Sequence, residues 1–260
     1  MTTSIIQALT RDRPWAGSCV GVDTDGDRCY AVRVRGGPLG LTSERVAWDD
    51  PALQSVIVTG RTAVAAAMPQ CASIIRWVDT PLTGMGKARR VLPSLLDIQL
   101  PFKLEECACE FPRVERKPGG HVRGLAAVAR VSDVAQRLGE LRARNIDPFF
   151  LDQESLALWT QGLAEWPVHS GGAGLQSLRA LVYLGASRTV MVLGRGSVFI
   201  SAHSLHGLRA DQVIRLLRAQ CEEPGGAPPP VDWLWVGPEA AQRETIDSFL
   251  RDIGGKDPVV

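Results

Sequence analysis

The sequence predicts an α/β protein in which a unit of three strands and a helix occurs twice, around an inserted α/β segment. Short apolar segments joined by tight turns follow one another in both halves of the 260-residue chain, and a segment of helical character follows each set. A stretch rich in glycine and serine at 168–174 separates the halves. Because identity between the halves is slight, the repeat concerns architecture rather than sequence.

The first unit begins with three expected strands. The turn Asp25-Gly26-Asp27 separates the first two, and the second alternates between apolar and polar residues, as a half-buried strand does. The strands are expected at 18–23, 29–35 and 41–48. Asp49-Asp50-Pro51 then predicts the start of a helix, with an acid at the cap and proline in the first turn. We expect this helix to continue to about Ala67, and a strand at 72–78 to close the unit.

The inserted segment opens with a predicted amphipathic helix at 86–100. Lys87, Arg89 and Arg90 lie on the side opposite to an apolar helical stripe. This stripe consists of Val91, Leu92, Leu95, Leu96 and Leu100. Two strands, a helix, a short strand and a further helix are expected after it, at 107–114, 121–131, 132–144, 148–152 and 153–163.

The second unit repeats the strand meander of the first. Its elements are expected as strands at 178–184, 189–193 and 198–203, a helix at 210–220, a strand at 231–236 and a helix at 238–250. The link from Gln220 to Val231 is too short to hold another subdomain. We therefore expect a second lobe that is smaller than a complete one.

Composition excludes several functional classes. The formal net charge of +1 argues against a protein whose main function is to bind nucleic acid, since such binding needs a surplus of basic residues. The six cysteines show no C-x-x-C spacing, which favours reduced thiols and no zinc site. No signal peptide and no apolar run of about 20 residues is present. We expect a soluble cytoplasmic protein that meets the membrane only through a partner or a segment beyond this chain.

Three loops resemble those of actin-like ATPases. Residues 21–26, Gly-Val-Asp-Thr-Asp-Gly, resemble the first phosphate loop, and residues 181–189 resemble the second. Residues 234–240, Leu-Trp-Val-Gly-Pro-Glu-Ala, resemble the strand–glycine–helix junction that contacts adenosine. Within this superfamily, residues 89–102 are similar to a segment of the PilM and GspL proteins of type IV pilus and type II secretion systems. Together these pieces cover most of the chain.

The resemblance implies a two-lobed actin-like fold, a duplicated ribonuclease H-like fold with an inserted α/β subdomain and a reduced second lobe. The implied parts are a first-lobe unit at 1–80, the insertion at 81–147, a return to the first lobe at 148–170 and the second lobe at 171–260.

The resemblance also implies a vestigial nucleotide site. Its residues would be Asp23, Gly26, Arg28, Gly185, Ala186, Ser187 and Gly237. Three departures from the pattern of actin-like ATPases argue against hydrolysis of Mg·ATP. Tyr183 stands in place of the second carboxylate, Asp25 and Asp27 add negative charge beside a triphosphate, and Pro238 removes a backbone donor. Each repulsive pair at ~4 Å costs about 4 kcal/mol at an effective dielectric near 20. We expect no catalytic residue, no metal and no cofactor, and binding of Mg·ATP without turnover stays open as the alternative.

The function implied is a cytoplasmic assembly scaffold, peripheral to the inner membrane, that docks a motor ATPase and a segment of an inner-membrane assembly protein. Partner binding would involve Arg89, Arg90, Leu95, Leu96, Gln99 and Phe102, beside a groove between the insertion and the first lobe. A dimer is allowed, and no nucleic acid is expected.

Other interpretations stay open at this point. The chain could be an ATPase or sugar-kinase-like enzyme of the same fold, or an unrelated α/β interaction domain. The glycines and Asp23 could be plain turn residues, and the basic residues near Arg90 a solvated helix face. His169, His203 and His206 share no spacing with a nearby acid, which argues against a metal site.

We predict that Tyr183→Asp alone does not restore ATP hydrolysis, because Asp25, Asp27 and Pro238 remain in place. Phosphate release by the variant should equal that of the unaltered chain in a coupled assay. Release above this background would contradict the prediction.

Overall fold

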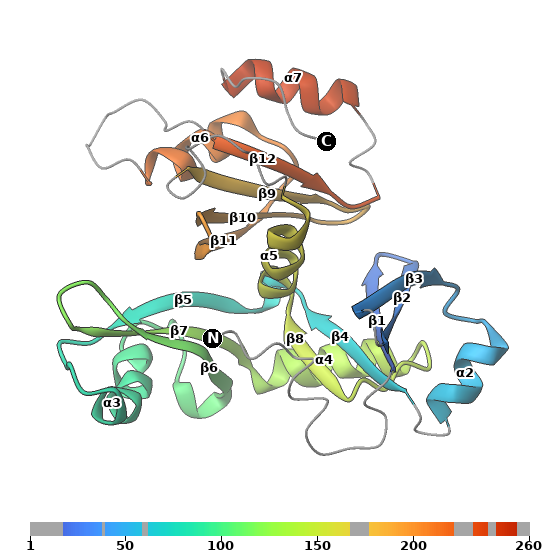
Figure 1. The fold of residues 1–260 in the computed structure, drawn as a ribbon, viewed down its shortest axis with the longest axis horizontal. Helices are drawn as coiled ribbons and strands as arrows, with labels where there is room; N and C mark the ends of the chain where they lie inside the picture. Colours follow the sequence, from blue (N-terminus) through green and yellow to red (C-terminus); the bar gives the residue numbers. More distant parts are fainter. Residues whose placement is uncertain are drawn as a thin grey trace. The chain divides into compact units, whose positions relative to one another are not determined.

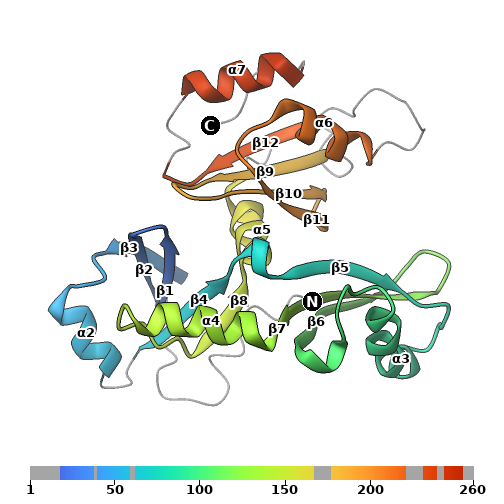
Figure 2. The same cartoon turned by 180° about the vertical axis from the view of Figure 1, so that it is seen from behind.

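The computed structural model describes residues 18–37, 40–58, 62–166, 177–220, 231–238 and 243–253. The chain forms two compact units. Unit 1 contains the residues up to Met68 together with Ala135–Asp152, and unit 2 contains Pro69–Val134 and the residues from Gln153 onward. Figure 1 labels the elements, and Figure 2 shows them from behind. The four-part division expected from the sequence stays a prediction.

Unit 1 is built on a five-stranded sheet of order β3-β2-β1-β4-β8. Its strands are β1 (Ser18–Asp25), β2 (Arg28–Gly37), β3 (Gly40–Val46), β4 (Ala63–Met68) and β8 (Phe150–Gln153). Strand β1 pairs antiparallel with β2 and parallel with β4. Its helices are α2 (Pro51–Val58) and most of α4 (Val131–Arg142).

The core of unit 1 lies between this sheet and the two helices. Val20 and Val22 of β1 pack with Leu53 of α2 and Leu141 of α4. Arg137 of α4 is buried, and its guanidinium donates to the Thr24 hydroxyl at 2.7 Å and to the Ala67 carbonyl at 3.1 Å. The helix is therefore fixed to the ends of β1 and β4.

Unit 2 contains two sheets. The first is antiparallel, with order β5-β7-β6, and consists of β5 (Ile74–Asp79), β6 (Cys107–Arg116) and β7 (Val122–Arg130). Helix α3 (Met85–Asp97) packs on one face, where Leu92 and Leu96 meet Val78, Ala126 and Val128. Two short 3-10 helices, η1 (Gln70–Ala72) and η2 (Leu104–Glu106), precede β5 and β6.

The second sheet of unit 2 has the order β11-β10-β9-β12. Its strands are β9 (Leu178–Leu184), β10 (Thr189–Arg195), β11 (Val198–Leu205) and β12 (Val231–Val236). Helices α6 (Ala210–Arg218) and α7 (Arg243–Ile253) cover one face, and α5 (Glu154–Glu165) covers the other (Figures 1 and 2).

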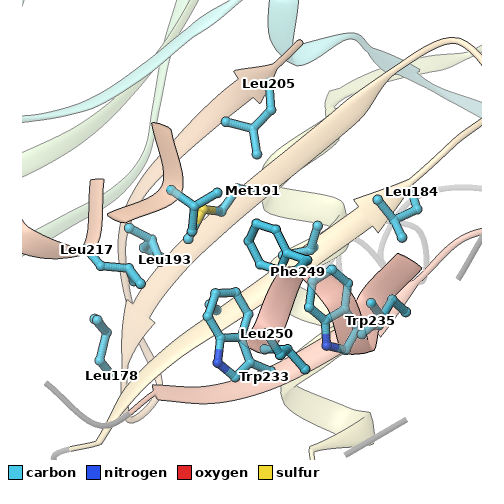
Figure 3. Close-up of a cluster of buried hydrophobic side chains, with 14 residues drawn as sticks. Leu178, Leu184, Met191, Leu193, Leu205, Leu217, Trp233, Trp235, Phe249 and Leu250 are labelled. Carbon is cyan, nitrogen blue, oxygen red and sulfur yellow. The ribbon is translucent and has the colours of Figure 1, made fainter. Parts of the chain in front are cut away.

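The core under α6 and α7 is rich in aromatic residues. Trp233 and Trp235 of β12 stack with their ring centroids 5.5 Å apart, and the ring of Phe249 from α7 meets both edge-on (Figure 3). Residues two apart on a strand share a face, so both indoles are available to hold α7.

Tight packing also joins α5 to the opposite face of this sheet. Trp159 of α5 lies directly over Gly194, where an added Cβ would come 2.0 Å from the indole ring. The Trp77 indole N–H of β5 donates to the Phe199 carbonyl of β11 at 2.9 Å. The two sheets of unit 2 are therefore connected by a side chain as well as by a shared apolar core.

The two meanders have the same topology. In each case a central strand, β1 or β9, has two antiparallel neighbours in succession on one side and a parallel strand on the other. Only residues 219–230 lie between α6 and β12. The predicted α/β class, the duplication and the reduced second lobe are confirmed.

Two expectations about secondary structure are wrong. The helix expected to reach Ala67 ends at Val58, and Ala63–Met68 forms strand β4. Alanine favours helices in isolation, but this segment pairs between β1 and β8, and tertiary pairing overrides local propensity. The strand expected at 72–78 is β5, and it pairs with β7 in unit 2 instead of closing unit 1.

The remaining elements lie close to their expected positions. Strands β9 and β12 have the expected bounds, and α7 begins later than expected, at Arg243. The expected boundary at 168–174 lies outside the described residues.

We predict that Gly194→Ala destabilises unit 2 by about 1–3 kcal/mol, because the new methyl group overlaps the Trp159 ring. The control is Gly86→Ala on α3, where no atom lies within 4 Å of an added Cβ. This change should stabilise the protein by about 0.5–1 kcal/mol. Urea unfolding followed by tryptophan fluorescence measures both, and equal effects of the two changes would contradict the packing described.

Candidate functional site

The residues expected in the first nucleotide loop lie at the turn between β1 and β2. Asp23 pairs with Tyr30, and Asp25 pairs with Arg28 where the strands separate. Gly26 has a φ of 59°, which is left-handed backbone that glycine adopts easily. The Gly26 carbonyl accepts a hydrogen bond from Arg144 at 2.7 Å. The turn is thus fixed to the end of α4 by the protein's own residues.

The residues expected in the second loop connect β9 to β10. The Gly185 N–H donates to the Arg188 carbonyl at 2.9 Å, and Ala186 and Ser187 are exposed at the tip. Tyr183, two residues before this turn, is buried, and the Arg188 guanidinium lies 5.1 Å from the centre of its ring. A cation–π contact therefore occupies the position where the resemblance implies a carboxylate.

Gly237 has a structural role of its own. Its φ is 107°, and a Cβ there would lie 2.4 Å from the Leu184 carbonyl oxygen at the end of β9. Only glycine allows the backbone after β12 to approach β9 this closely. The presence of glycine is therefore explained without any ligand.

A buried ion pair that the sequence analysis missed lies beside the second turn. The carboxylate of Glu154, the first residue of α5, accepts from Arg188 Nε at 2.6 Å and from the Gln70 backbone N–H at 2.8 Å. The side chains of Glu154 and Arg188 are 6% and 14% exposed. An acid in the first turn of a helix also gains from the helix dipole.

Neighbouring side chains complete the polar cluster around Glu154. Gln153 caps α5 by accepting from the Leu156 N–H at 2.9 Å, and its amide donates to Gln70 Oε1 at 2.6 Å. The same amide donates to the Ser73 hydroxyl at 3.2 Å, and the Ser155 hydroxyl donates to Gln70 Oε1. We call Gln70, Ser73, Gln153, Glu154, Ser155 and Arg188 the α5 polar cluster.

One part of this cluster carries a sequence signal. Gln153-Glu154 at the start of an expected helix is a cap followed by an acid, a pattern typical of helix N-termini. Its pairing with Arg188, 34 residues along the chain, leaves no spacing signal that the sequence analysis could have used.

The residues expected to bind a partner divide into exposed and buried groups. Arg89 and Arg90 are exposed and form no ion pair within the described residues. Leu96 is fully buried on the side of α3 that faces the sheet, and Leu95 packs on the same core. The side chain of Leu96 is therefore part of the fold rather than of any surface.

The end of α3 adds an apolar residue that sequence reasoning did not single out. Ile98 is 82% exposed, and Val91, two turns earlier on the same side of the helix, is 37% exposed. The expectation that Val91 belongs to the apolar stripe is therefore wrong, because the buried side of α3 is formed by Ala88, Leu92 and Leu96. Gln99 is exposed, and its carbonyl accepts from Arg76 at 2.8 Å. Phe102 is half-buried, with the Arg130 guanidinium 5.5 Å from its ring centre.

Within the described ranges, no three or more His, Cys, Asp or Glu side chains gather in a way that could hold a metal ion. His203 lies on β11, where burial lowers the pKa of its imidazole, while His169 lies outside the described residues. No helix in the described part of the chain has both the length and the hydropathy needed to cross a bilayer.

Comparison with known proteins gives a match of fold. No family model matches the sequence, and no curated protein matches it. A solved chain of the PilM–PilN type IV pilus biogenesis complex is 18% identical, with a TM-score of 0.63 over 93% of this chain and 88% of that chain.

Two other solved structures are similar at lower scores. The cytoplasmic domain of EpsL, an inner-membrane component of the type II secretion system of Vibrio cholerae, is 16% identical, with a TM-score of 0.49 over 85% of this chain and 84% of that chain. A Bacteroides thetaiotaomicron protein of unknown function with an actin-like ATPase fold is 9% identical, with a TM-score of 0.45 over 92% and 89%.

The strand order and the similarity to the chain of the PilM–PilN complex therefore show an actin-like fold. Among proteins of this fold, the chain is similar to the PilM–PilN complex chain over nearly its whole length.

We predict that Arg188→Met destabilises the protein by about 3–5 kcal/mol, because it leaves the Glu154 carboxylate buried without its cation. Glu154→Gln/Arg188→Met should cost clearly less than the sum of the single changes, as measured by urea unfolding. The control is Lys117→Met, which removes the exposed pair with Asp79 and should cost less than about 1 kcal/mol. Additive effects of the two single changes would show that the pair is not coupled.

Proposed function

We propose that this chain is a non-catalytic cytoplasmic component of a type IV pilus or type II secretion platform at the inner membrane. The observation that carries the proposal is the fold shared with a chain of the PilM–PilN complex over 93% of this protein. In this role the chain would lie against the inner membrane and hold other components together, among them a motor ATPase and a segment of an inner-membrane protein.

The chemistry of the second turn supports a role without ATP turnover. An actin-like nucleotide site needs carboxylate oxygens for the water shell of Mg²⁺. Here Tyr183 replaces the expected carboxylate, and both oxygens of the nearby Glu154 accept hydrogen bonds from within the chain. The residues of this turn therefore do not fit Mg·ATP, and we assign no step to it.

The turn between β1 and β2 adds little that would offset the missing carboxylate. Asp23 remains at the end of β1, but Asp27 is exposed at the tip of the turn, where its charge opposes a triphosphate. Pro238 has no N–H to donate beside Gly237. Each turn, taken by itself, therefore supports a role without ATP turnover.

The exposed side of α3 is the surface we assign to partner binding. We define the α3 surface as Lys87, Arg90, Val91 and Ile98, which are all exposed, whereas Arg89 lies on the opposite side of the helix from Ile98. Lys87 and Arg90, which form no ion pair with any described residue, lie toward its start, and Ile98, which is 82% exposed, lies at its end. This arrangement suits an acidic segment with one apolar anchor, because charged residues set orientation and a buried aliphatic group supplies affinity.

We predict that Ile98→Asp and Arg90→Glu each weaken binding of a PilN-type cytoplasmic segment about tenfold or more, which is a loss of at least ~1.4 kcal/mol. The probe is a fluorescent peptide that carries this segment from the same organism, and polarisation measures its affinity. Arg215→Glu on α6, whose side chain is 73% exposed, is the control, and it should change the affinity less than about twofold.

The outcomes separate two errors. If the parent chain binds the segment tightly and neither α3 variant changes the affinity, the α3 surface is not the binding site, but the scaffold role still stands. Failure of the parent chain to bind any such segment would count against the pilus or secretion assignment itself.

A further inference from the structure

The chain passes from one unit to the other at three places, and the α5 polar cluster lies immediately after two of them. The boundaries fall at Met68–Pro69, Val134–Ala135 and Asp152–Gln153. Gln70 and Ser73 follow the first boundary, and Gln153, Glu154 and Ser155 follow the third. Two connections that are 84 residues apart in sequence therefore enter unit 2 side by side.

Buried hydrogen bonds join these two connections directly. The Gln70 backbone N–H donates to Glu154, the Gln70 side-chain oxygen accepts from Gln153 and Ser155, and Gln153 also donates to Ser73. All five residues are 9% exposed or less. Water therefore cannot replace these partners unless the cluster opens.

Arg188 extends the same network to the turn between β9 and β10. Its Nε atom lies 2.6 Å from Glu154 Oε1, and its backbone carbonyl accepts from the Gly185 N–H that begins the turn. The tip of this turn, at Ala186 and Ser187, is exposed. A movement of the exposed tip is thus transmitted to the buried Glu154 carboxylate by the side chain of Arg188.

Loss of a single member of the cluster leaves a buried polar group of another member without its partner. Without Arg188, the Glu154 charge is buried and lacks its cation, and without Glu154, the Gln70 N–H loses its acceptor. Buried polar networks of this kind are favourable when every member is satisfied and costly when one is not. Opening should therefore be cooperative across all three segments.

We propose that the α5 polar cluster is a clamp that couples the β9–β10 turn to both chain connections. A contact that draws Arg188 away from Glu154 would loosen 69–73 and 153–156 together. This inference does not depend on the pilus or secretion assignment, since it concerns only bonds within unit 2.

Hydrogen exchange of the unaltered chain tests the coupling without any substitution. The amides of Gln70 and Leu156 donate to side chains of the cluster, from the first and the third connection respectively. If the clamp opens as one unit, both amides exchange with the same opening constant and the same dependence on denaturant. Opening constants that differ by tenfold or more would overturn the proposal.

Arg188→Met gives the second test. We expect exchange at 69–73, 153–156 and 185–188 to rise together, by about tenfold or more, while Lys117→Met leaves all three segments unchanged. Faster exchange confined to 185–188 would show a local ion pair and contradict the clamp. If Arg188→Met does not fold, the double variant Glu154→Gln/Arg188→Met is used instead, since it leaves no buried charge. A joint rise in exchange at all three segments supports the clamp, and a rise confined to 185–188 contradicts it.

Discussion

A buried glutamate, Glu154, whose side chain is only 6% exposed, constrains much of unit 2. Glu154 begins α5, the helix that covers one face of the second sheet, and its charge must be matched inside the protein. The match comes from the side chain of Arg188 and the backbone of Gln70, which belong to distant parts of the chain. The start of α5, the segment before β5 and the β9–β10 turn therefore keep fixed relative positions.

The loops that resemble phosphate loops each have a structural role in this protein. The turn after β9 leads to an arginine that neutralises an internal acid, and Gly237 is required by the approach of the backbone to Leu184. In unit 1, the Gly26 carbonyl accepts from Arg144. Each turn is thus stabilised by contacts within the chain.

Sequence reasoning recovered the parts of the fold that rest on local patterns. Strands β9 and β12 were predicted with their bounds because both are compact apolar runs bordered by breakers. Ala63–Met68 was misassigned, since the alanines carry a helical preference and their partners, β1 and β8, lie far away in sequence. The start of α5 gave a capping signal, but the charge pair of Glu154 with Arg188 depends on tertiary packing and left none. Likewise, periodicity placed Leu96 on the apolar stripe of α3 but could not show that Ile98, at the end of the helix, stays outside the core.

The central claim is that an actin-like fold is used here for assembly and not for nucleotide chemistry. Isothermal titration of the purified chain with ATP and Mg²⁺, combined with a phosphate-release assay on the same sample, tests it most directly. The account predicts neither a binding heat at micromolar nucleotide nor phosphate release above the buffer blank. Micromolar binding accompanied by turnover would contradict it.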